Sequence, residues 1–193
     1  ENFPKNDVTI NEIIPIIDSL NVDIIALQEI ESTQDFNNMV NQLGVNWVGY
    51  KAENSSYGVL SYLINTTFIT INSPPSTILS QFNYDFTYRP PYVLQFEFNN
   101  TAYTLINVHF KCCDGGEERR TNANAHLENY IKNNLSNNNV IVVGDFNDEL
   151  VDENNVFDVF GLTNKIPIYL SVFFPIAFLG IISMIGLIRI NEK

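Results

Sequence analysis

The order of apolar and polar residues alternates between helical and strand spacing before the apolar C-terminal run, which predicts an α/β fold. A first helix is predicted from apolar residues three and four positions apart: Ile10, Ile13, Ile14 and Ile17. Because proline interrupts a helix interior, Pro15 favours a regular helix that begins near Ile14. The apolar run from Val22 to Leu27 is then predicted to form a buried strand.

A second helix and a series of strands follow. Thr33 can cap the helix, and Gly44 is predicted to end it. Four aromatic and β-branched segments are separated by turn residues: Trp47 to Tyr50, Tyr57 to Ile64, Phe68 to Ile71 and Tyr92 to Phe98. These segments are predicted to form antiparallel strands.

Two more strands enclose a third helix. Tyr103 to Phe110 is predicted to be a strand, whose period of two places Leu105, Asn107 and His109 on one face. The helix is predicted within Arg120 to Leu135, and the apolar strand Val140 to Val143 follows it. Strands that alternate with helices in this way predict a layered sandwich, with residues 1–164 as one domain.

The C-terminal part of the chain differs in character. Residues 166–188 contain no charged side chain, and about 20 apolar residues suffice to cross a bilayer. Residues 165–193 therefore predict a transmembrane helix, or else a tail produced by a frame shift in an AT-rich gene. Flanking charges favour a cytoplasmic C-terminus, which would place the domain outside the cytoplasm. Without a genuine span, the protein is expected to be secreted or soluble.

The charge balance limits how the protein can bind phosphate. There are 10 Lys and Arg against 22 Asp and Glu, for a formal charge of -12. This excludes a cationic nucleic-acid clamp, because the overall field repels polyanions. Phosphate would have to be held by bound cations or by a few placed Arg and Lys. The two cysteines, Cys112 and Cys113, are adjacent without zinc-site spacing, and we interpret them as ordinary thiols.

Acid, base and amide groups stand at the ends of three predicted strands: Glu29, His109, and Asp145 with Asn147. Each alone is more often a turn, cap or core residue. Together they match phosphodiester hydrolysis, which needs a carboxylate for a hard cation, a group that orients water, and donors to the phosphoryl oxygens.

Four short motifs resemble the endonuclease/exonuclease/phosphatase family of deoxyribonuclease-like, metal-dependent phosphoesterases. They are LQE at Leu27–Glu29, NVHFK at Asn107–Lys111, the pair Arg119 and Arg120, and GDFND at Gly144–Asp148. The resemblance spans Glu1 to about Phe160. It implies two mixed β-sheets flanked by helices, incomplete at both ends, with an apolar helix added at the C-terminus.

The resemblance also implies roles for individual residues. Glu29 would bind the metal, usually Mg²⁺ but alternatively Mn²⁺ or Ca²⁺, and His109 would contact the scissile phosphate or leaving oxygen. Asp145 would orient or deprotonate the attacking water, and Asn147 would bond the phosphoryl oxygens. For two further residues, a functional role and a purely structural role are both open. Glu53 would orient His109 or be a solvated loop acid, and Arg89 would face the substrate phosphate or make a strand-edge contact.

The sequence departs from the family after about Phe160, where the family's later Asp and its final Asp-His pair are not visible. The leading hypothesis is a metal-dependent phosphodiesterase that acts on a phosphoester, with nucleic acid as the favoured substrate, or an inactive remnant of one. The alternatives are a catalytically dead, membrane-anchored binding module and a lipid or inositol phosphatase of the same family. No protein partner follows from the sequence.

Overall fold

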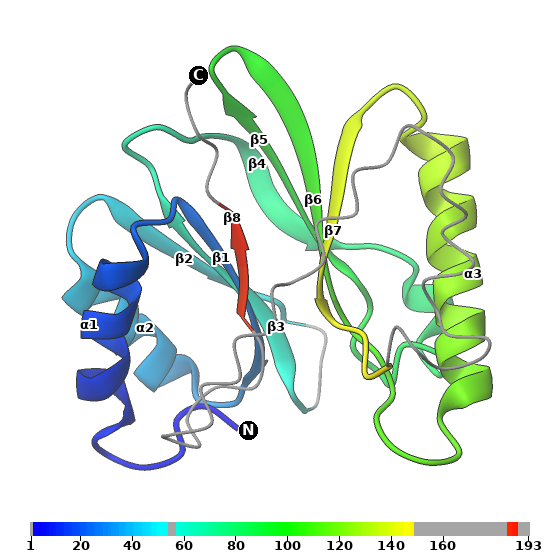
Figure 1. Ribbon diagram of the computed structural model, residues 1–193, viewed down its shortest axis with the longest axis horizontal. Helices are drawn as coiled ribbons and strands as arrows, with labels where there is room; N and C mark the ends of the chain where they lie inside the picture. Colours follow the sequence, from blue (N-terminus) through cyan, green and yellow to red (C-terminus); the bar gives the residue numbers. More distant parts are fainter. Residues whose placement is uncertain (1, 54–56, 149–184, 189–193) are drawn as a thin grey trace.

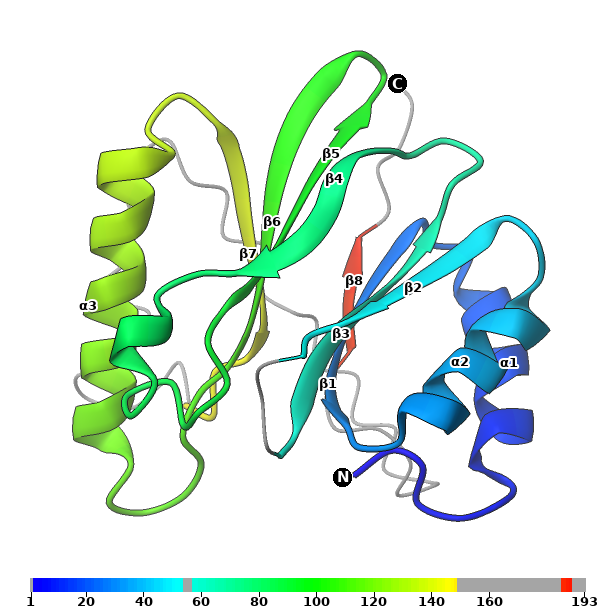
Figure 2. The ribbon, with the colours of Figure 1, turned by 180° about the vertical axis from the view of Figure 1, so that it is seen from behind.

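The computed structural model describes residues 2–53, 57–148 and 185–188, in which two β-sheets lie face to face with helices on their outer sides (Figures 1 and 2). The first sheet has the strand order β2-β3-β1-β8 and the second β4-β5-β6-β7. The strands of the first are β1 (Ile24–Ile30), β2 (Trp47–Lys51), β3 (Val59–Asn65) and β8 (Ile185–Ile188). Those of the second are β4 (Thr70–Thr77), β5 (Tyr92–Phe98), β6 (Thr101–His109) and β7 (Asn139–Asp145). The predicted layered sandwich is confirmed.

Helices α1 (Thr9–Leu20) and α2 (Thr33–Leu43) cover the outer face of the first sheet (Figure 1). Their apolar side chains form one cluster with Ile25, Leu27 and Leu63 of the sheet. The cap of α2 is Ser32, whose Oγ accepts a hydrogen bond from the backbone N–H of Asp35 at 3.1 Å. The helix thus begins at Thr33 with its cap one residue earlier than predicted.

The prediction that the first helix begins near Ile14 is wrong, because α1 begins at Thr9 and contains Pro15. Proline removes one helical hydrogen bond, which would have ended on the carbonyl of Asn11. Both Pro15 and Asn11 are exposed. Water can therefore bond that carbonyl, and the apolar face that packs on the sheet holds the helix together.

Helix α3 (Glu117–Asn134) covers the outer face of the second sheet and connects β6 to β7, while the 3₁₀ turn η1 (Ser80–Phe82) packs beside it (Figure 2). Ile106, Val108 and Phe110 alternate on the side of β6 that faces α3. β6 and β7 pair in parallel, whereas β4, β5 and β6 pair antiparallel, so this sheet is mixed. The predicted alternation of side chains along β6 is confirmed.

The space between the sheets is filled mainly by apolar side chains. Alternate residues of β5 point into it: Leu94, Phe96 and Phe98. Tyr62 of β3 crosses this core, and its hydroxyl donates to the backbone carbonyls of Tyr92 at 2.7 Å and Leu105 at 3.2 Å. The phenol thus joins the two sheets at a point where their backbones do not pair.

A buried amide pair makes a second link between the sheets. Asn107 of β6 accepts a hydrogen bond from Gln28 Nε2 of β1 at 2.8 Å. The amide of Asn107 donates in turn to the carbonyls of Leu27 at 3.0 Å and Ser61 at 3.2 Å. Gln28 immediately precedes Glu29, and Asn107 lies two residues before His109. This link therefore fixes how the end of β1 stands relative to the end of β6.

Replacing Asn107 by Leu is expected to lower the free energy of unfolding by about 3 kcal/mol, since buried partners lose their hydrogen bonds. Leu fills a similar volume but leaves Gln28 Nε2 only a 3.5 Å contact with the carbonyl of Ala26. Urea unfolding measures the change. Asn134→Leu, at the exposed end of α3, is the control and should stay within about 0.5 kcal/mol of wild type. Equal unfolding midpoints for the two variants would contradict the linking role.

Strand β8 corrects part of the prediction for the C-terminal run. Its residues Ile185–Ile188 pair antiparallel with β1, Ile24 opposite Ile188 and Leu27 opposite Ile185. The predicted apolar helix is wrong at these four residues, because they satisfy the backbone hydrogen bonds along one side of β1. The remainder of the predicted span lies outside the described residues. In the described ranges, no helix is long and apolar enough to cross a membrane.

Candidate active site

Glu29 lies where β1 departs from regular pairing with β3. The register between these strands shifts between Leu27 and Ile30, and Glu29 itself has a φ of 58°. A bulge of this kind redirects a side chain, and a left-handed conformation is uncommon for glutamate. The carboxylate Oε2 accepts the backbone N–H of Asn2 at 2.9 Å, and Oε1 lies 3.9 Å from His109 Nε2. The irregular backbone thus holds a half-buried carboxylate against the second sheet.

His109 and Asp145 are the last residues of β6 and β7, and they stand opposite each other in the parallel register. His109 Nε2 lies 3.6 Å from Asp145 Oδ2. The two residues are only 3% and 4% exposed, so little water separates them. The imidazole therefore lies between two carboxylates, one from each sheet.

Arg89 and Asn147 meet at the backbone carbonyl of Phe110. Arg89 Nη2 donates to this carbonyl at 3.3 Å and to Thr87 Oγ1 at 2.9 Å, and Asn147 Nδ2 donates to the same carbonyl at 3.1 Å. The backbone N–H of Asn147 also donates to Asp145 Oδ1 at 2.9 Å. A buried cation and a side-chain amide thus lie next to the acid–histidine–acid cluster.

Burial sets the protonation of these groups. Burial, and then the positive charge of Arg89, lowers the pKa of His109 to about 3, although Glu29 opposes this. Burial also raises the pKa of Asp145, with the Asn147 N–H and Arg89 opposing and Glu29 adding to the rise. Burial alone would raise the pKa of Glu29. The hydrogen bond from the Asn2 N–H and nearby positive charge outweigh this effect and bring the pKa below its ordinary value. The imidazole is therefore neutral at pH 7, beside a carboxylate more basic than an exposed aspartate.

Folding stability is expected to depend on pH through His109. Its pKa is about 3 when folded and about 6.5 when unfolded, so between these values the unfolded chain binds more protons and stability falls as pH falls. Relative to His109→Gln, wild type should lose up to about 1.4 kcal/mol per pH unit below pH 6.5. Urea unfolding from pH 7 to pH 4 measures this difference. His126→Gln keeps the buried imidazole and is the control. Parallel pH profiles for wild type and His109→Gln would contradict the prediction.

The structure does not bring Glu53 to His109. Among the described residues, no hydrogen bond or ion pair joins the two side chains, and His109 Nδ1 is buried without a hydrogen-bond partner. Glu53 is exposed just after β2, at the edge of the first sheet, whereas His109 faces β1. Burial and then the charge of Glu53 raise the pKa of Tyr92 to about 12. A role for Glu53 in orienting the imidazole has no contact to support it.

Three further residues support the site, namely Gln28, Asn107 and Arg120. Gln28 and Asn107 lie inside the motifs, but their amides neither carry protons nor bear charge, so the sequence gives no chemical reason to single them out. Arg120 is 6% exposed, and its Nε lies 3.7 Å from Asp148 Oδ2. A charged residue at the start of a helix usually faces solvent, so the sequence did not indicate that Arg120 is buried. The sequence did indicate one thing: Arg120 and Asp148 both lie within the motifs that resemble the family.

Among the described residues, Glu29 has the chemistry to hold a hydrated divalent cation. Within the described ranges, no three His, Cys, Asp or Glu side chains are grouped as ligands of one ion. Mg²⁺ commonly binds through one or two carboxylates and keeps several waters. Glu29 suits this, because its side chain is 19% exposed and its carboxylate can therefore meet an ion that keeps its waters. Glu29 is therefore the residue that would hold the ion.

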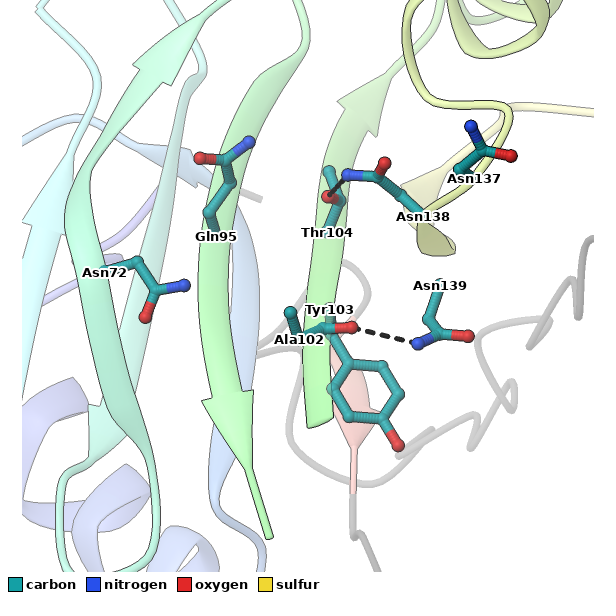
Figure 3. Close-up of a pocket in the computed structure, with 8 residues that line it drawn as sticks. All are labelled: Asn72, Gln95, Ala102, Tyr103, Thr104, Asn137, Asn138 and Asn139. Atoms are coloured by element: carbon teal, nitrogen blue, oxygen red, sulfur yellow. Dashed lines mark hydrogen bonds between the residues drawn. The ribbon is translucent and has the colours of Figure 1, made fainter. Parts of the chain in front are cut away.

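A pocket of 380 Å³ lies elsewhere, near the start of β6 and β7 (Figure 3). His109 and Asp145 are the last residues of these two strands. Amide side chains of Asn72, Gln95 and Asn138 line it, together with Thr104. It has no carboxylate, imidazole or cationic side chain in its lining. The pocket is therefore separate from the cluster around His109.

The fold and the cluster define a two-sheet α/β sandwich with an acid–histidine–acid site at the strand ends. The chain belongs to the endonuclease/exonuclease/phosphatase family, whose model matches residues 1–162. Nucleases and phosphatases both hydrolyse phosphoester bonds. The resemblance found in the motifs is confirmed.

Solved structures show the same fold. A humanised D. rerio TDP2 is 15% identical with a TM-score of 0.66, over 86% of this chain and 69% of that one. D. rerio TDP2 complexed with a single-strand DNA product is 16% identical with a TM-score of 0.67, over 83% and 62%. The human nocturnin catalytic domain with bound sulfate is 17% identical with a TM-score of 0.63, over 83% and 63%. The chain thus spans about two thirds of each. No curated protein matches the sequence.

Proposed function

We propose that this protein is a metal-dependent phosphodiesterase that cleaves nucleic acid, with Mg²⁺ as the preferred ion and Mn²⁺ or Ca²⁺ as alternatives. The observation that carries the proposal is the position of His109 Nε2, 3.9 Å from Glu29 and 3.6 Å from Asp145. Family membership supports phosphoester hydrolysis. The bound DNA product in one structural neighbour supports nucleic acid as the substrate.

Each side chain has a distinct task in this mechanism. Glu29 would hold the cation, which when bound would neutralise charge on the phosphoryl oxygens. Asp145, whose pKa burial raises, accepts the proton of the attacking water. The imidazole of His109 stays neutral, because burial disfavours its protonated form. In this state it hydrogen-bonds the phosphate or the leaving oxygen.

Two groups stabilise the negative charge of the phosphate. The Asn147 amide donates to a phosphoryl oxygen, and it does so from a left-handed backbone with a φ of 51° that directs it. The Arg89 guanidinium stays charged although burial lowers its pKa, and it draws the phosphate toward the cluster. These roles require the amide and guanidinium to exchange part of their bonding to the Phe110 carbonyl for bonds to substrate.

The test is cleavage of a labelled single-stranded DNA oligonucleotide by the purified chain in Mg²⁺. EDTA should abolish cleavage and excess Mg²⁺ should restore it. His109→Ala is expected to lower the rate about a hundredfold, a usual cost for losing one group that handles protons or the leaving oxygen. Glu128→Gln, a change on α3 at the carboxylate that pairs with Lys132, is the control and should be unaffected. Equal rates for wild type and His109→Ala would indicate a contaminating nuclease and refute the proposal.

The same preparations decide between nucleic acid and the lipid alternative. A phosphoinositide in mixed micelles replaces the oligonucleotide, and released inorganic phosphate is measured. Release that depends on His109 without DNA cleavage would favour a lipid phosphatase. A membrane-anchored, inactive binding module remains a prediction, and carbonate extraction of membranes from expressing cells tests it.

A further inference from the structure

The loop from β6 to α3 brings two thiols together close to the site. Cys112 and Cys113 follow His109 by three and four residues. Their Sγ atoms are 2.7 Å apart, with the Cys113 thiol donating to Cys112, and the Cys113 side chain is exposed. Adjacent cysteines in a sequence give no indication of where their side chains point. The structure shows that these two face each other, with Cys113 exposed and Cys112 partly buried.

A bond between such neighbours would be easy to break. The Cα atoms of adjacent residues are about 3.8 Å apart, whereas disulfides usually join Cα atoms about 4.4 to 6.8 Å apart. The resulting strain makes the bond more readily reduced, and strained or exposed disulfides tend to be labile rather than structural. Chemistry at this pair would therefore be reversible.

The surroundings distinguish the two sulfurs. Cys112 Sγ accepts from the Cys113 thiol at 2.7 Å and lies 3.8 Å from Lys111 Nζ, so two donors point at this sulfur. The hydrogen bond to Cys112 raises the pKa of the Cys113 thiol, which therefore keeps its proton longer. Since the thiolate is the nucleophile, Cys112 is the attacking sulfur and Cys113 the second to react.

We propose that Cys112 and Cys113 form a dithiol–disulfide exchange site that reacts with low-molecular-weight disulfides. The Cys112 thiolate attacks one sulfur of the small disulfide, whose S–S bond breaks and releases one thiolate that takes up a proton. Cys113 loses its proton and attacks Cys112 Sγ, which forms the bond between the neighbours and releases the second small thiol. The small disulfide gains two electrons and the protein loses two hydrogens.

Closing this ring changes the contacts of the loop. The Cys113 carbonyl accepts the backbone N–H of Gly116 at 3.1 Å and Arg120 Nη1 at 3.4 Å. Arg120 also donates to the Lys111 carbonyl at 3.0 Å. The φ angle of Cys113, which is 71° in the dithiol, is one of the torsions inside a ring between adjacent residues. Closing the ring changes this angle and turns the Cys113 carbonyl away from these donors. Oxidation thus loosens the start of α3.

The first measurement is the intact mass of the full chain after incubation with oxidised glutathione, then after dithiothreitol. We expect the loss of two hydrogens and of both free thiols, with full reversal on reduction. Cys113→Ser should instead stop at a stable mixed disulfide carrying one glutathione group. Cys112→Ser should react more slowly than Cys113→Ser. Wild type that gains two glutathione groups, forms disulfide-linked dimers or keeps both thiols would overturn the proposal.

Hydrogen exchange provides the second measurement. The Gly116 amide should exchange at least about tenfold faster in the oxidised protein, because its acceptor is lost. Cys112→Ser/Cys113→Ser treated with the same oxidant should show no change. Unchanged exchange in oxidised wild type would overturn the structural consequence. Neither measurement needs turnover, so its result is independent of the proposed hydrolysis.

Discussion

The Asp145→Asn variant is expected to keep its fold and to lose about a thousandfold in kcat for phosphodiester cleavage. Asparagine has nearly the same shape, and its oxygen can still accept the Asn147 N–H that Asp145 Oδ1 accepts at 2.9 Å. It cannot take a proton from water. The loss therefore falls on the chemical step, and steady-state kinetics with saturating Mg²⁺ measure it.

The matched stability measurement separates this chemical loss from damage to the fold. Asp145 is 4% exposed with a raised pKa, so its ionised form is costly to bury. Removing that charge should leave the thermal midpoint of Asp145→Asn equal to or above that of wild type. A lower midpoint together with lost activity would mean that Asp145 serves the fold instead. Unchanged kcat would remove Asp145 from the mechanism.

The Gly144→Ala variant is expected to be destabilised by about 4 kcal/mol, which is large for a single methyl group. Gly144 has a φ of 135°, and a Cβ there would lie 2.0 Å from the backbone oxygen of Val108 and 2.8 Å from its nitrogen. These are backbone atoms of the neighbouring strand β6, so they cannot rotate aside. β6 and β7 would have to separate next to His109 and Asp145.

Gly44→Ala is the control for this change. Gly44 also has a left-handed φ, of 101°, but its added Cβ would meet nothing within 4 Å. It should cost about 2 kcal/mol, which is the backbone strain alone. Guanidinium unfolding of both variants gives the difference. Equal losses would mean that conformation, and not the close approach of β6 to β7, makes glycine necessary at position 144.

Periodic patterns predicted most of the fold. Segments such as Tyr92–Phe98 carry an uninterrupted alternation, and the structure has a strand with those bounds. Errors arose where a local rule competed with packing. Pro15 suggested a late helix start, but packing of the apolar face against the first sheet outweighed the loss of one hydrogen bond. Apolar content alone could not distinguish a membrane helix from an edge strand at Ile185–Ile188.

The site was predictable to the extent that its residues end regular strands. His109 and Asp145 close β6 and β7, and both were named from the sequence. Glu29 was also named, but the bulge and left-handed backbone that aim it were not, because they depend on pairing with β3. Glu53 follows an edge strand, and sequence alone could not show on which side of the sheets it would fall. Backbone conformations that depend on pairing between distant strands cannot be predicted from local sequence patterns.

The parallel register that pairs His109 with Asp145 has an evolutionary consequence. The spacing of the imidazole and carboxylate is set by the hydrogen-bonded ladder between neighbouring strands, not by the segment that carries α3 from one strand to the next. Insertions or deletions in the loops on either side of α3 can alter which molecules reach the strand ends without changing the geometry of the pair. Related proteins can therefore diverge in what they recognise while they keep the same spacing between the imidazole and the carboxylate.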